Sequence, residues 1–394
     1  MQFTKSLEFL NSLISNPNKR TIILTGATGV VGTHVLYELL LQIIEGYFEG
    51  KIFLLVRADG KRKISGYDRI RRILSVDFIP DYLKRFRISE LMINIEVLEC
   101  NFGEDDLSHT LSKFQMEENV FLIHSAASTN LAPSNSAEIE NQEVNFKGSL
   151  KLFESCKNLV NKVIYISTVY ACGKLSGLIK DEYSEIESPI FKNPYEQYKF
   201  KTERALDAKC KEWNIEYQIL RPGVVIGRLI DRPHYFLPKY NVVYAFAAFF
   251  HNLKERGVNQ CIYIKVNPNT SLHLVSVDYV AKAITKAYAD SSVKELNIIP
   301  QKGCGKDKIQ LLLETVGYDN YKFVQQHSLP TNPYQRAYQT KVAPSFEPYI
   351  NDEAFEFDNK QLKILMSDVD MPNVEDHFES LISFAVSRNF EIID

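Results

Sequence analysis

Residues 21–40, TIILTGATGVVGTHVLYELL, decide the fold. A short apolar run leads into a turn with the spacing T-G-x-x-G-x-x-G, and the pattern after it predicts an amphipathic helix. Such a turn needs a residue that tolerates positive φ, and it needs bare backbone so that a pyrophosphate can approach the N–H groups that begin the helix. An ordinary tight turn is the alternative, but the strand–turn–helix context favours a dinucleotide site. We assign to it Thr25, Gly26, Thr28, Gly29, Val30, Val31 and Gly32.

The same alternation of strand-like and helix-like segments continues through about two-thirds of the chain. Strands that read as continuous Ile, Val and Leu runs are buried on both faces, as in a parallel sheet covered by helices. We therefore predict an α/β fold, a Rossmann-type doubly wound parallel sheet with a smaller, mostly helical C-terminal substrate lobe. The predicted strands are residues 21–25, 52–56, 95–98, 120–124, 163–167 and 217–220, with later ones at 272–277 and 296–299.

This alternation stops after the sixth predicted strand, residues 217–220, where aromatic residues and prolines become frequent. We place the NAD(P)-binding core, with the catalytic residues, in residues 1–227 and the substrate-binding lobe in residues 228–394, and we expect residues 272–299 to return to the core. Residues 242–250 form an apolar stretch that suits either an acyl-chain pocket or plain hydrophobic core.

Composition excludes several classes of function. A net charge of −3 gives no broad basic face for nucleic acid. Six scattered cysteines without a C-x-x-C spacing predict neither disulfides nor a metal site. No apolar run approaches the roughly 20 residues that span a bilayer, and the first 20 residues lack the apolar centre of a secretory signal. We expect a cytoplasmic protein without a transmembrane segment; the oligomeric state is left open.

The end of the second predicted strand bears on the choice of cofactor. Folds that prefer NAD usually hold an acidic residue there, which binds the ribose 2′-hydroxyl. Here Arg57 stands at that point, and a guanidinium can bind a 2′-phosphate in bidentate fashion. Asp59 keeps NADH open, while Arg69 offers a second phosphate contact. The sequence therefore favours NADPH over NADH.

A Tyr-x-x-x-Lys spacing occurs five times, so position must select among the copies. The segment NPYEQYKFKTERAL (residues 193–206) is helix-like and follows VIYISTVY (residues 163–170), a strand that ends at Ser167-Thr168. In short-chain dehydrogenases a Ser or Thr at such a strand end faces a helix with Tyr and Lys on one side. Tyr195 and Lys199 meet this arrangement, because residues four apart share a helix face.

These residue types suit proton transfer to a carbonyl oxygen. A tyrosine hydroxyl ordinarily titrates near pH 10, and the lysine ammonium one turn away is expected to lower the pKa of Tyr195. The same ammonium can bind the nicotinamide ribose, and Thr168 would hold the substrate oxygen. A solvated surface pair is the alternative. The predicted catalytic residues are Thr168, Tyr195 and Lys199.

From Thr21 to Ile299 the sequence resembles the extended short-chain dehydrogenases/reductases, and among them the thioester reductases and fatty acyl-CoA reductases. The segments that carry the resemblance are TGATGVVG (25–32), LLVR (54–57), FLIHSAAS (121–128), VNFKGSLKLF (144–153), YISTVY (165–170), NPYEQYKFKTE (193–203), LRPGVVIG (220–227), LVSVDYVAKAI (274–284) and, weakly, FEFDNKQLKIL (355–365). Cys100-Asn101 departs from the Gly-Asp usual in the group, although Asn101 can still bind the adenine.

The resemblance implies a free-standing, NADPH-dependent oxidoreductase of lipid or polyketide metabolism. Its substrate would be an acyl-CoA or an acyl-carrier-protein thioester, reduced to the aldehyde and, in a second step, to the alcohol. Further cofactor contacts are expected from Asn101, Phe102, Ser125, Ala126, Ala127, Pro222, Gly223 and Val225, together with Tyr195 and Lys199.

Other functions remain open at this point. A ketone or hydroxysteroid reductase, or a nucleotide-sugar epimerase, would use the same Thr-Tyr-Lys triad. A thiol-based aldehyde dehydrogenase would need an activated nucleophile, for which Cys172 has no neighbouring His or Asp in the sequence. A cofactor-binding regulator would be expected to lose Tyr195 or Lys199. His124 ends a buried strand and is interpreted as structural.

Overall fold

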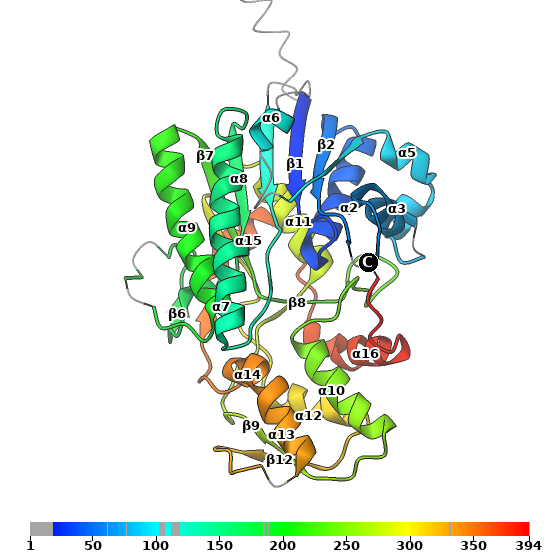
Figure 1. The fold of residues 1–394 in the computed structure, drawn as a ribbon, viewed down its shortest axis with the longest axis vertical. Helices are drawn as coiled ribbons and strands as arrows, with labels where there is room; N and C mark the ends of the chain where they lie inside the picture. The colour runs from blue at the N-terminus through cyan, green and yellow to red at the C-terminus, as the bar shows by residue number, and fades with distance from the viewer. Residues whose placement is uncertain are drawn as a thin grey trace, which may run out of the picture.

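The computed structural model describes residues 19–60, 62–75, 77–101, 107–111, 119–183, 186–187, 189–330 and 332–393. Seven parallel strands form the main sheet, in the order β11-β7-β5-β4-β1-β2-β3. Figure 1 shows this sheet in the upper part of the molecule, with β1 beside β2. This order confirms the predicted doubly wound fold. The strands are β1 (Lys19–Thr25), β2 (Glu49–Val56), β3 (Ile95–Glu99), β4 (Val120–His124), β5 (Lys162–Ile166), β7 (Glu216–Pro222) and β11 (Glu295–Ile298).

Alternate side chains of each central strand enter two separate cores, which explains the continuous apolar runs. In β1, Ile22 packs into the core beneath α2 (Val30–Ile44), α3 (Gly66–Ser75) and α11 (Val277–Ala287). Ile23 packs into the opposite core, beneath α6 (Leu107–Leu111), α8 (Ser149–Cys156) and α9 (Pro194–Trp213).

A continuous helical segment covers the face of the sheet that also packs against α9. It begins as α7 (Asn135–Asn141), changes to the π-helix η1 (Gln142–Gly148) and continues as α8. π-Helical turns inside longer helices are rare and often lie at functional sites. Here η1 packs against α9.

Residues 272–299 contribute one strand to the main sheet and one strand outside it. The predicted strand at 272–277 is the shorter β10 (Leu274–Ser276), which pairs with β8 (Val224–Ile226) instead of joining the main sheet. The chain then forms α11, which packs against α2, and β11, which extends the main sheet beside β7.

The remaining elements form a lobe below the sheet in Figure 1. Most of the apolar stretch 242–250 lies in α10 and belongs to the core of this lobe, where the rings of Phe246, Phe250, Tyr338 and Phe346 pack at tilted or edge-on angles with centroids 4.4–6.3 Å apart. The lobe holds α10 (Val243–Glu255), β9 (Ile262–Lys265), α12 (Lys306–Thr315), β12 (Tyr321–Val324), α13 (Pro333–Lys341), α14 (Ala343–Phe346), η3 (Glu347–Tyr349) and α16 (Val374–Ser387).

Shorter elements connect these parts. They are α4 (Asp81–Lys84), α5 (Ile88–Met92), η2 (Val169–Cys172), β6 (Leu178–Ile179), β13 (Glu356–Phe357) and α15 (Lys360–Leu365). Within the described ranges, no helix combines the length and apolarity needed to cross a bilayer.

Candidate active site

The glycine-rich turn between β1 and α2 has the backbone that a dinucleotide needs. Gly26 has a φ of +76°, and a Cβ there would lie 2.6 Å from the backbone nitrogen of Ala126. At Gly32 a Cβ would lie 2.1 Å from the carbonyl oxygen of Gly26, so the helix packs directly on the turn. Gly29 precedes α2 without a side-chain cap, which leaves the N–H groups of the first helical turn to an anion.

Arg69 connects two segments predicted to bind the cofactor. Its buried guanidinium donates to the carbonyl oxygen of Arg57 at the end of β2 (2.7 Å) and to Oγ1 of Thr28 in the glycine-rich turn (3.0 Å). Arg57 is exposed. The geometry therefore gives Arg69 a positioning role and leaves Arg57 as the guanidinium that faces outward at the strand end.

Asp59 lies in a small loop closed by its pairing with Ile64. Its carboxylate accepts the backbone N–H of Arg62 (3.0 Å) and lies 3.8 Å from the Arg62 guanidinium. A hollow of about 450 Å³ opens on this loop, and its charged lining residues are Arg62, Lys63, Asp68, Arg71 and Arg72. Cations outnumber the single carboxylate there, so the surface beside the end of β2 attracts anions.

The end of β4 is fixed by buried hydrogen bonds. Oγ1 of Thr25 lies 2.7 Å from Nδ1 of His124, and it accepts the backbone N–H of Ala126 (3.1 Å). Nε2 of His124 lies 2.8 Å from Oγ of Ser149. Burial lowers the pKa of His124 to about 3, so the ring is neutral at physiological pH. His124 is fully buried and hydrogen-bonded at both nitrogens, as its structural interpretation predicted.

Asn145, in the π-helix η1, was not singled out from the sequence. Its side chain accepts the backbone N–H of Ser128 (2.7 Å) and donates to the carbonyl oxygen of the same residue (2.9 Å). This pair of bonds holds the loop that follows β4, which contains Ser125, Ala126 and Ala127. A buried Asn in the VNFKGS segment was the available signal, but nothing in the sequence placed it opposite that loop.

Helix α9 presents Tyr195 and Lys199 on one face. It begins after Asn193, whose side chain accepts the backbone N–H of Glu196 (3.1 Å), and Pro194 occupies the first turn. Nζ of Lys199 donates to the carbonyl oxygen of Ile166 at the end of β5 (2.6 Å). Burial lowers the pKa of Lys199 to about 7, with the Glu203 carboxylate acting in the opposite direction.

The pKa of Tyr195 departs from the expectation. Burial, followed by the nearby Glu196 carboxylate, raises it above its ordinary value, whereas the sequence predicted that Lys199 would lower it. The reason is that Lys199 is itself desolvated and turned toward Ile166. A phenol that keeps its proton is suited to act as a proton donor.

Two hydroxyl residues, not one, lie at the end of β5. Oγ1 of Thr168 accepts the backbone N–H of Tyr170 (3.3 Å) and caps η2. Oγ of Ser167 is buried and makes no hydrogen bond in the described part of the chain. Both residues line the cavity that Tyr195 and Lys199 face. The Ser-Thr pair was visible in the sequence, but only Thr168 was predicted to act there.

These groups share one cavity of about 300 Å³ between the sheet and the lobe. It brings together eleven predicted residues: Gly29, Val30, Val31, Ser125, Ala127, Thr168, Tyr195, Lys199, Pro222, Gly223 and Val225. Val242 also lines it, from the apolar stretch that was expected to form either an acyl-chain pocket or core. Residues that line it without having been predicted are Thr129, Leu131, Ile166, Ser167, Tyr170, Val224, Lys239, Asn241 and Tyr349.

The other predicted residues lie behind this cavity or beyond its edge. Arg57 and Asn101 stand at the ends of β2 and β3, and Phe102 lies outside the described residues. Thr25, Gly26, Thr28, Gly32, Arg69 and Ala126 support the turn and the strand ends without lining the cavity.

The surroundings of Cys172 argue against a thiol-based aldehyde dehydrogenase. Its Sγ is fully buried next to the carbonyl oxygen of Gly173 (3.3 Å), and burial raises the pKa of the thiol to about 12. Cys172 is also absent from the cavity lining. In the described ranges no cluster of His, Cys, Asp and Glu could hold a metal ion.

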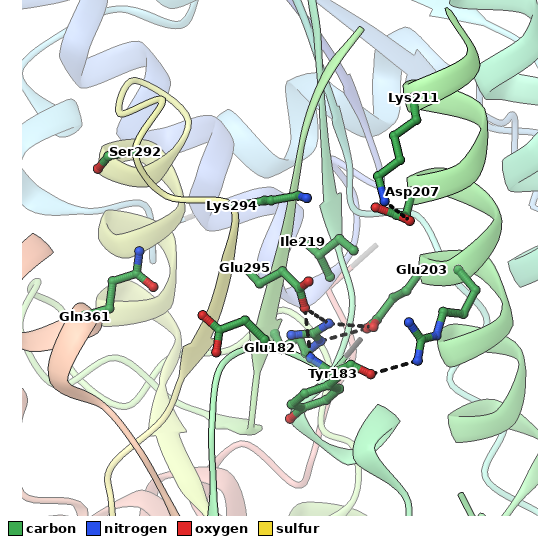
Figure 2. Close-up of a pocket in the computed structure, with 12 residues that line it drawn as sticks. Glu182, Tyr183, Glu203, Asp207, Lys211, Ile219, Ser292, Lys294, Glu295 and Gln361 are labelled. Atoms are coloured by element: carbon green, nitrogen blue, oxygen red, sulfur yellow. Dashed lines mark hydrogen bonds and ion pairs between the residues drawn. The ribbon is translucent and has the colours of Figure 1, made fainter. Parts of the chain in front are cut away.

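A second cavity, of about 400 Å³, lies against α9, β7 and β11 (Figure 2). At its base the buried guanidinium of Arg221 donates to both carboxylate oxygens of Glu203 (3.0 and 2.7 Å) and to Glu295 (2.6 Å). It also donates to the carbonyl oxygen of Asp181 (2.6 Å) and lies 3.6 Å from the ring centre of Tyr183. Because these charges satisfy one another, we interpret the cluster as structural.

Curated relatives match part of the chain. A putative fatty acyl-CoA reductase of Drosophila melanogaster, CG8303, is 30% identical over 199 residues, which are 49% of this chain and 34% of that protein. A dTDP-D-glucose 4,6-dehydratase of Dictyostelium discoideum is 27% identical over 230 residues, 56% of this chain and 46% of that protein. The chain thus spans between a third and a half of the length of these relatives.

Solved structures share the fold. The terminal R domain of the myxalamid PKS-NRPS pathway superposes with a TM-score of 0.66 at 20% identity, covering 95% of this chain and 92% of that one. The UDP-glucose 4-epimerase of Thermotoga maritima superposes with a TM-score of 0.60 at 21% identity, covering 94% of this chain and all of that one.

A family model assigns the chain. The NAD-binding model described as "Male sterility protein" matches residues 24–284, from the glycine-rich turn to α11. This span includes the Tyr195/Lys199 helix and most of the cavity lining. The protein therefore belongs to the male sterility protein family, a branch of the extended short-chain dehydrogenases/reductases.

Proposed function

We propose that this protein reduces an acyl thioester, carried on coenzyme A or on a carrier protein, to the aldehyde with NADPH. The observation that carries the proposal is one cavity that joins the glycine-rich turn to Tyr195, Lys199 and two hydroxyls. The likeness of the sequence to a putative fatty acyl-CoA reductase and of the fold to a terminal R domain supports the thioester as the substrate class.

The roles follow from the geometry and the pKa values. When held by the glycine-rich turn and Lys199, a reduced nicotinamide cofactor would supply a hydride for the thioester carbonyl carbon. Ser167 and Thr168 orient the carbonyl oxygen, and the Tyr195 hydroxyl, kept protonated by burial, gives that oxygen its proton. The hemithioacetal so formed breaks its C–S bond, releasing the thiol and the aldehyde. Lys199, with a pKa of about 7, returns a proton to Tyr195.

NADPH is the proposed cofactor because of the charges near the end of β2. Arg57 is exposed there, the hollow beside it is lined by four cations, and the Asp59 carboxylate is engaged within its own loop. An adenosine 2′-phosphate gains from such surroundings, whereas a free ribose 2′-hydroxyl lacks an unengaged carboxylate to bind.

The test follows nicotinamide absorbance with purified protein, NADPH or NADH, and a panel of acyl-CoAs, aldehydes and ketones. Acyl-CoA-dependent oxidation of NADPH that is lost in Tyr195→Phe, with the aldehyde trapped as product, is the expected result. The Tyr47→Phe variant is the control, because Tyr47 is exposed and also belongs to a Tyr-x-x-x-Lys spacing. Turnover of ketones alone would contradict a thioester substrate but remain consistent with the proposed roles of Thr168, Tyr195 and Lys199.

A nucleotide-sugar epimerase is the second candidate, favoured by the polar lining at the lobe end of the cavity, with Lys239, Asn241 and Tyr349. An epimerase keeps its cofactor bound and returns the hydride, so that the nicotinamide shows no net oxidation. Sugar isomerisation by the purified protein without added cofactor would establish this candidate against the reductase.

A further inference from the structure

The C-terminal lobe contacts α9 at the end of the helix that carries Tyr195. Tyr349, in η3 of the lobe, is buried, and its hydroxyl accepts a hydrogen bond from Nδ2 of Asn193 (2.8 Å). The other end of the same amide caps the helix, because Oδ1 of Asn193 accepts the backbone N–H of Glu196 (3.1 Å). One buried side chain, Asn193, therefore joins the lobe to the first turn of α9.

Further contacts surround this junction. Nζ of Lys192, the residue before the cap, lies 2.9 Å from a carboxylate oxygen of Asp352 in the lobe. The same ammonium lies 5.4 Å from the ring centre of Tyr170 and 5.5 Å from that of Tyr349. These two rings pack edge-on with their centres 4.8 Å apart. The start of α9, the segment after β5 and the lobe thus meet in one packed cluster.

The cluster reaches the cavity, because Tyr170, Tyr195 and Tyr349 all line it. Packing explains why the residue at 349 is aromatic, but a phenylalanine ring would pack equally well. What the hydroxyl of Tyr349 adds is the bond to Asn193. A buried polar group costs free energy unless it is hydrogen-bonded, so each member of this pair holds the other in place.

The first turn of α9 is where such a restraint matters for the reaction. Tyr195 is the second residue of the helix, in the turn whose backbone N–H groups have no helical partner and depend on the cap. Lys199, one turn further on, is held separately by the carbonyl oxygen of Ile166 (2.6 Å). A donor displaced by about 1 Å can lose about 10²-fold in rate, so the position of Tyr195 is the sensitive quantity.

We propose that Tyr349 is a positioning residue for proton transfer: through Asn193 it fixes the first turn of α9, and with it the place of the Tyr195 hydroxyl in the cavity. The inference rests on the proposed role of Tyr195 in the reduction. The lobe then has a part in the chemistry as well as in enclosing the substrate.

The experiment begins with Tyr349→Phe, which keeps the ring and removes the acceptor. The kcat for an accepted acyl-CoA should fall about tenfold, while the KM for NADPH stays unchanged because the glycine-rich turn is untouched. Tyr318→Phe is the matched control. Tyr318 is a buried tyrosine of the lobe whose hydroxyl donates to the carbonyl oxygen of Gln260 (2.7 Å), and it does not line the cavity. Both variants should lower the thermal unfolding temperature, but Tyr318→Phe should leave kcat nearly unchanged.

Asn193→Ser tests the other partner of the bond. Serine is also a preferred cap residue, but it has no amide donor for Tyr349. The kcat of Asn193→Ser should therefore fall as it does in Tyr349→Phe, and the double variant should be no slower than either single variant. Additive losses in kcat would mean that the two residues act separately, and would overturn the inference.

Hydrogen exchange of residues 193–200 provides a readout that needs no substrate. The amides of the first turn, including the capped N–H of Glu196, should exchange faster in Tyr349→Phe than in the wild type or in Tyr318→Phe. An unchanged kcat in Tyr349→Phe, unchanged exchange, or an equal loss of kcat in Tyr318→Phe would each contradict the positioning role and leave thioester reduction intact.

Failure of the proposed function would give a different result. In that case the wild type shows no Tyr195-dependent turnover with any thioester. The exchange comparison, together with kcat on whichever ketone or sugar nucleotide the wild type accepts, then still decides whether Tyr349 fixes the turn that carries Tyr195.

Discussion

Nζ of Lys199 donates to the main-chain carbonyl oxygen of Ile166 across a distance of 2.6 Å, which ties α9 to the end of β5. The ammonium is 2% exposed and also lies 4.2 Å from the ring centre of Tyr165. A lysine so deeply buried beside a neutral acceptor has a pKa of about 7, and this value makes its role testable apart from activity.

Lys199→Met should change how stability depends on pH. In the unfolded chain a lysine has a pKa of about 10.4, so between pH 7 and 10 the unfolded wild type binds more protons than the folded one. The free energy of unfolding of the wild type should therefore increase relative to that of Lys199→Met as the pH rises through this window. Urea unfolding at pH 6, 7, 8 and 9 measures the difference; a constant gap between the two proteins would contradict the lowered pKa.

Tyr195→Phe should abolish the reduction and leave the fold intact. Loss of a positioned proton donor costs about 10²–10⁴ in rate. Because Tyr195 is held in the first turn of α9 by the cap at Asn193, removal of its hydroxyl should not change the thermal unfolding temperature by more than a few degrees. Single-turnover kinetics with NADPH and circular dichroism measure the two effects; retained turnover would remove Tyr195 from the mechanism.

The two hydroxyls at the end of β5 should be distinguishable. Thr168 accepts the N–H of Tyr170, so Thr168→Val should lower both stability, by about 1 kcal/mol, and activity. Ser167 makes no hydrogen bond in the described structure, so Ser167→Ala should lower kcat at unchanged or slightly higher stability. Urea unfolding and kcat for each variant provide the comparison. An active Ser167→Ala beside an inactive Thr168→Val would assign the carbonyl oxygen to Thr168 alone.

The cofactor preference should depend on Arg57. Replacing Arg57 by Ala removes the exposed guanidinium at the end of β2 and should raise the KM for NADPH about tenfold, with little change for NADH. Arg69→Met should instead raise the KM for both cofactors, because Arg69 fixes Thr28 in the shared glycine-rich turn. Equal effects of Arg57→Ala on the KM for the two cofactors would mean that Arg57 does not bind the 2′-phosphate.

The sequence was sufficient to predict the parallel sheet and the glycine-rich turn because both depend on local patterns, an apolar run and a spacing of glycines. It also selected Tyr195/Lys199 among five similar spacings, by position relative to β5. It did not place Lys239 and Tyr349 in the cavity, since their proximity to α9 arises from contacts between segments far apart in the chain, and it did not distinguish Ser167 from its neighbour Thr168 at the end of β5. For the same reason, the sequence did not show that most apolar side chains of residues 242–250 pack into the core of the lobe.

The buried cluster around Arg221 should matter for stability more than for chemistry. Arg221→Met would leave Glu203, which is 3% exposed, without its bidentate partner, and an unpaired buried carboxylate costs about 3–5 kcal/mol. Adding Glu203→Gln should recover part of that loss, because the neutral amide no longer needs a cation. Urea unfolding of the two single variants and the double variant forms a cycle that measures the interaction between Arg221 and Glu203. Additive losses would mean that Arg221 is held chiefly by Glu295 and the carbonyl oxygen of Asp181, and that the Glu203 contact contributes little.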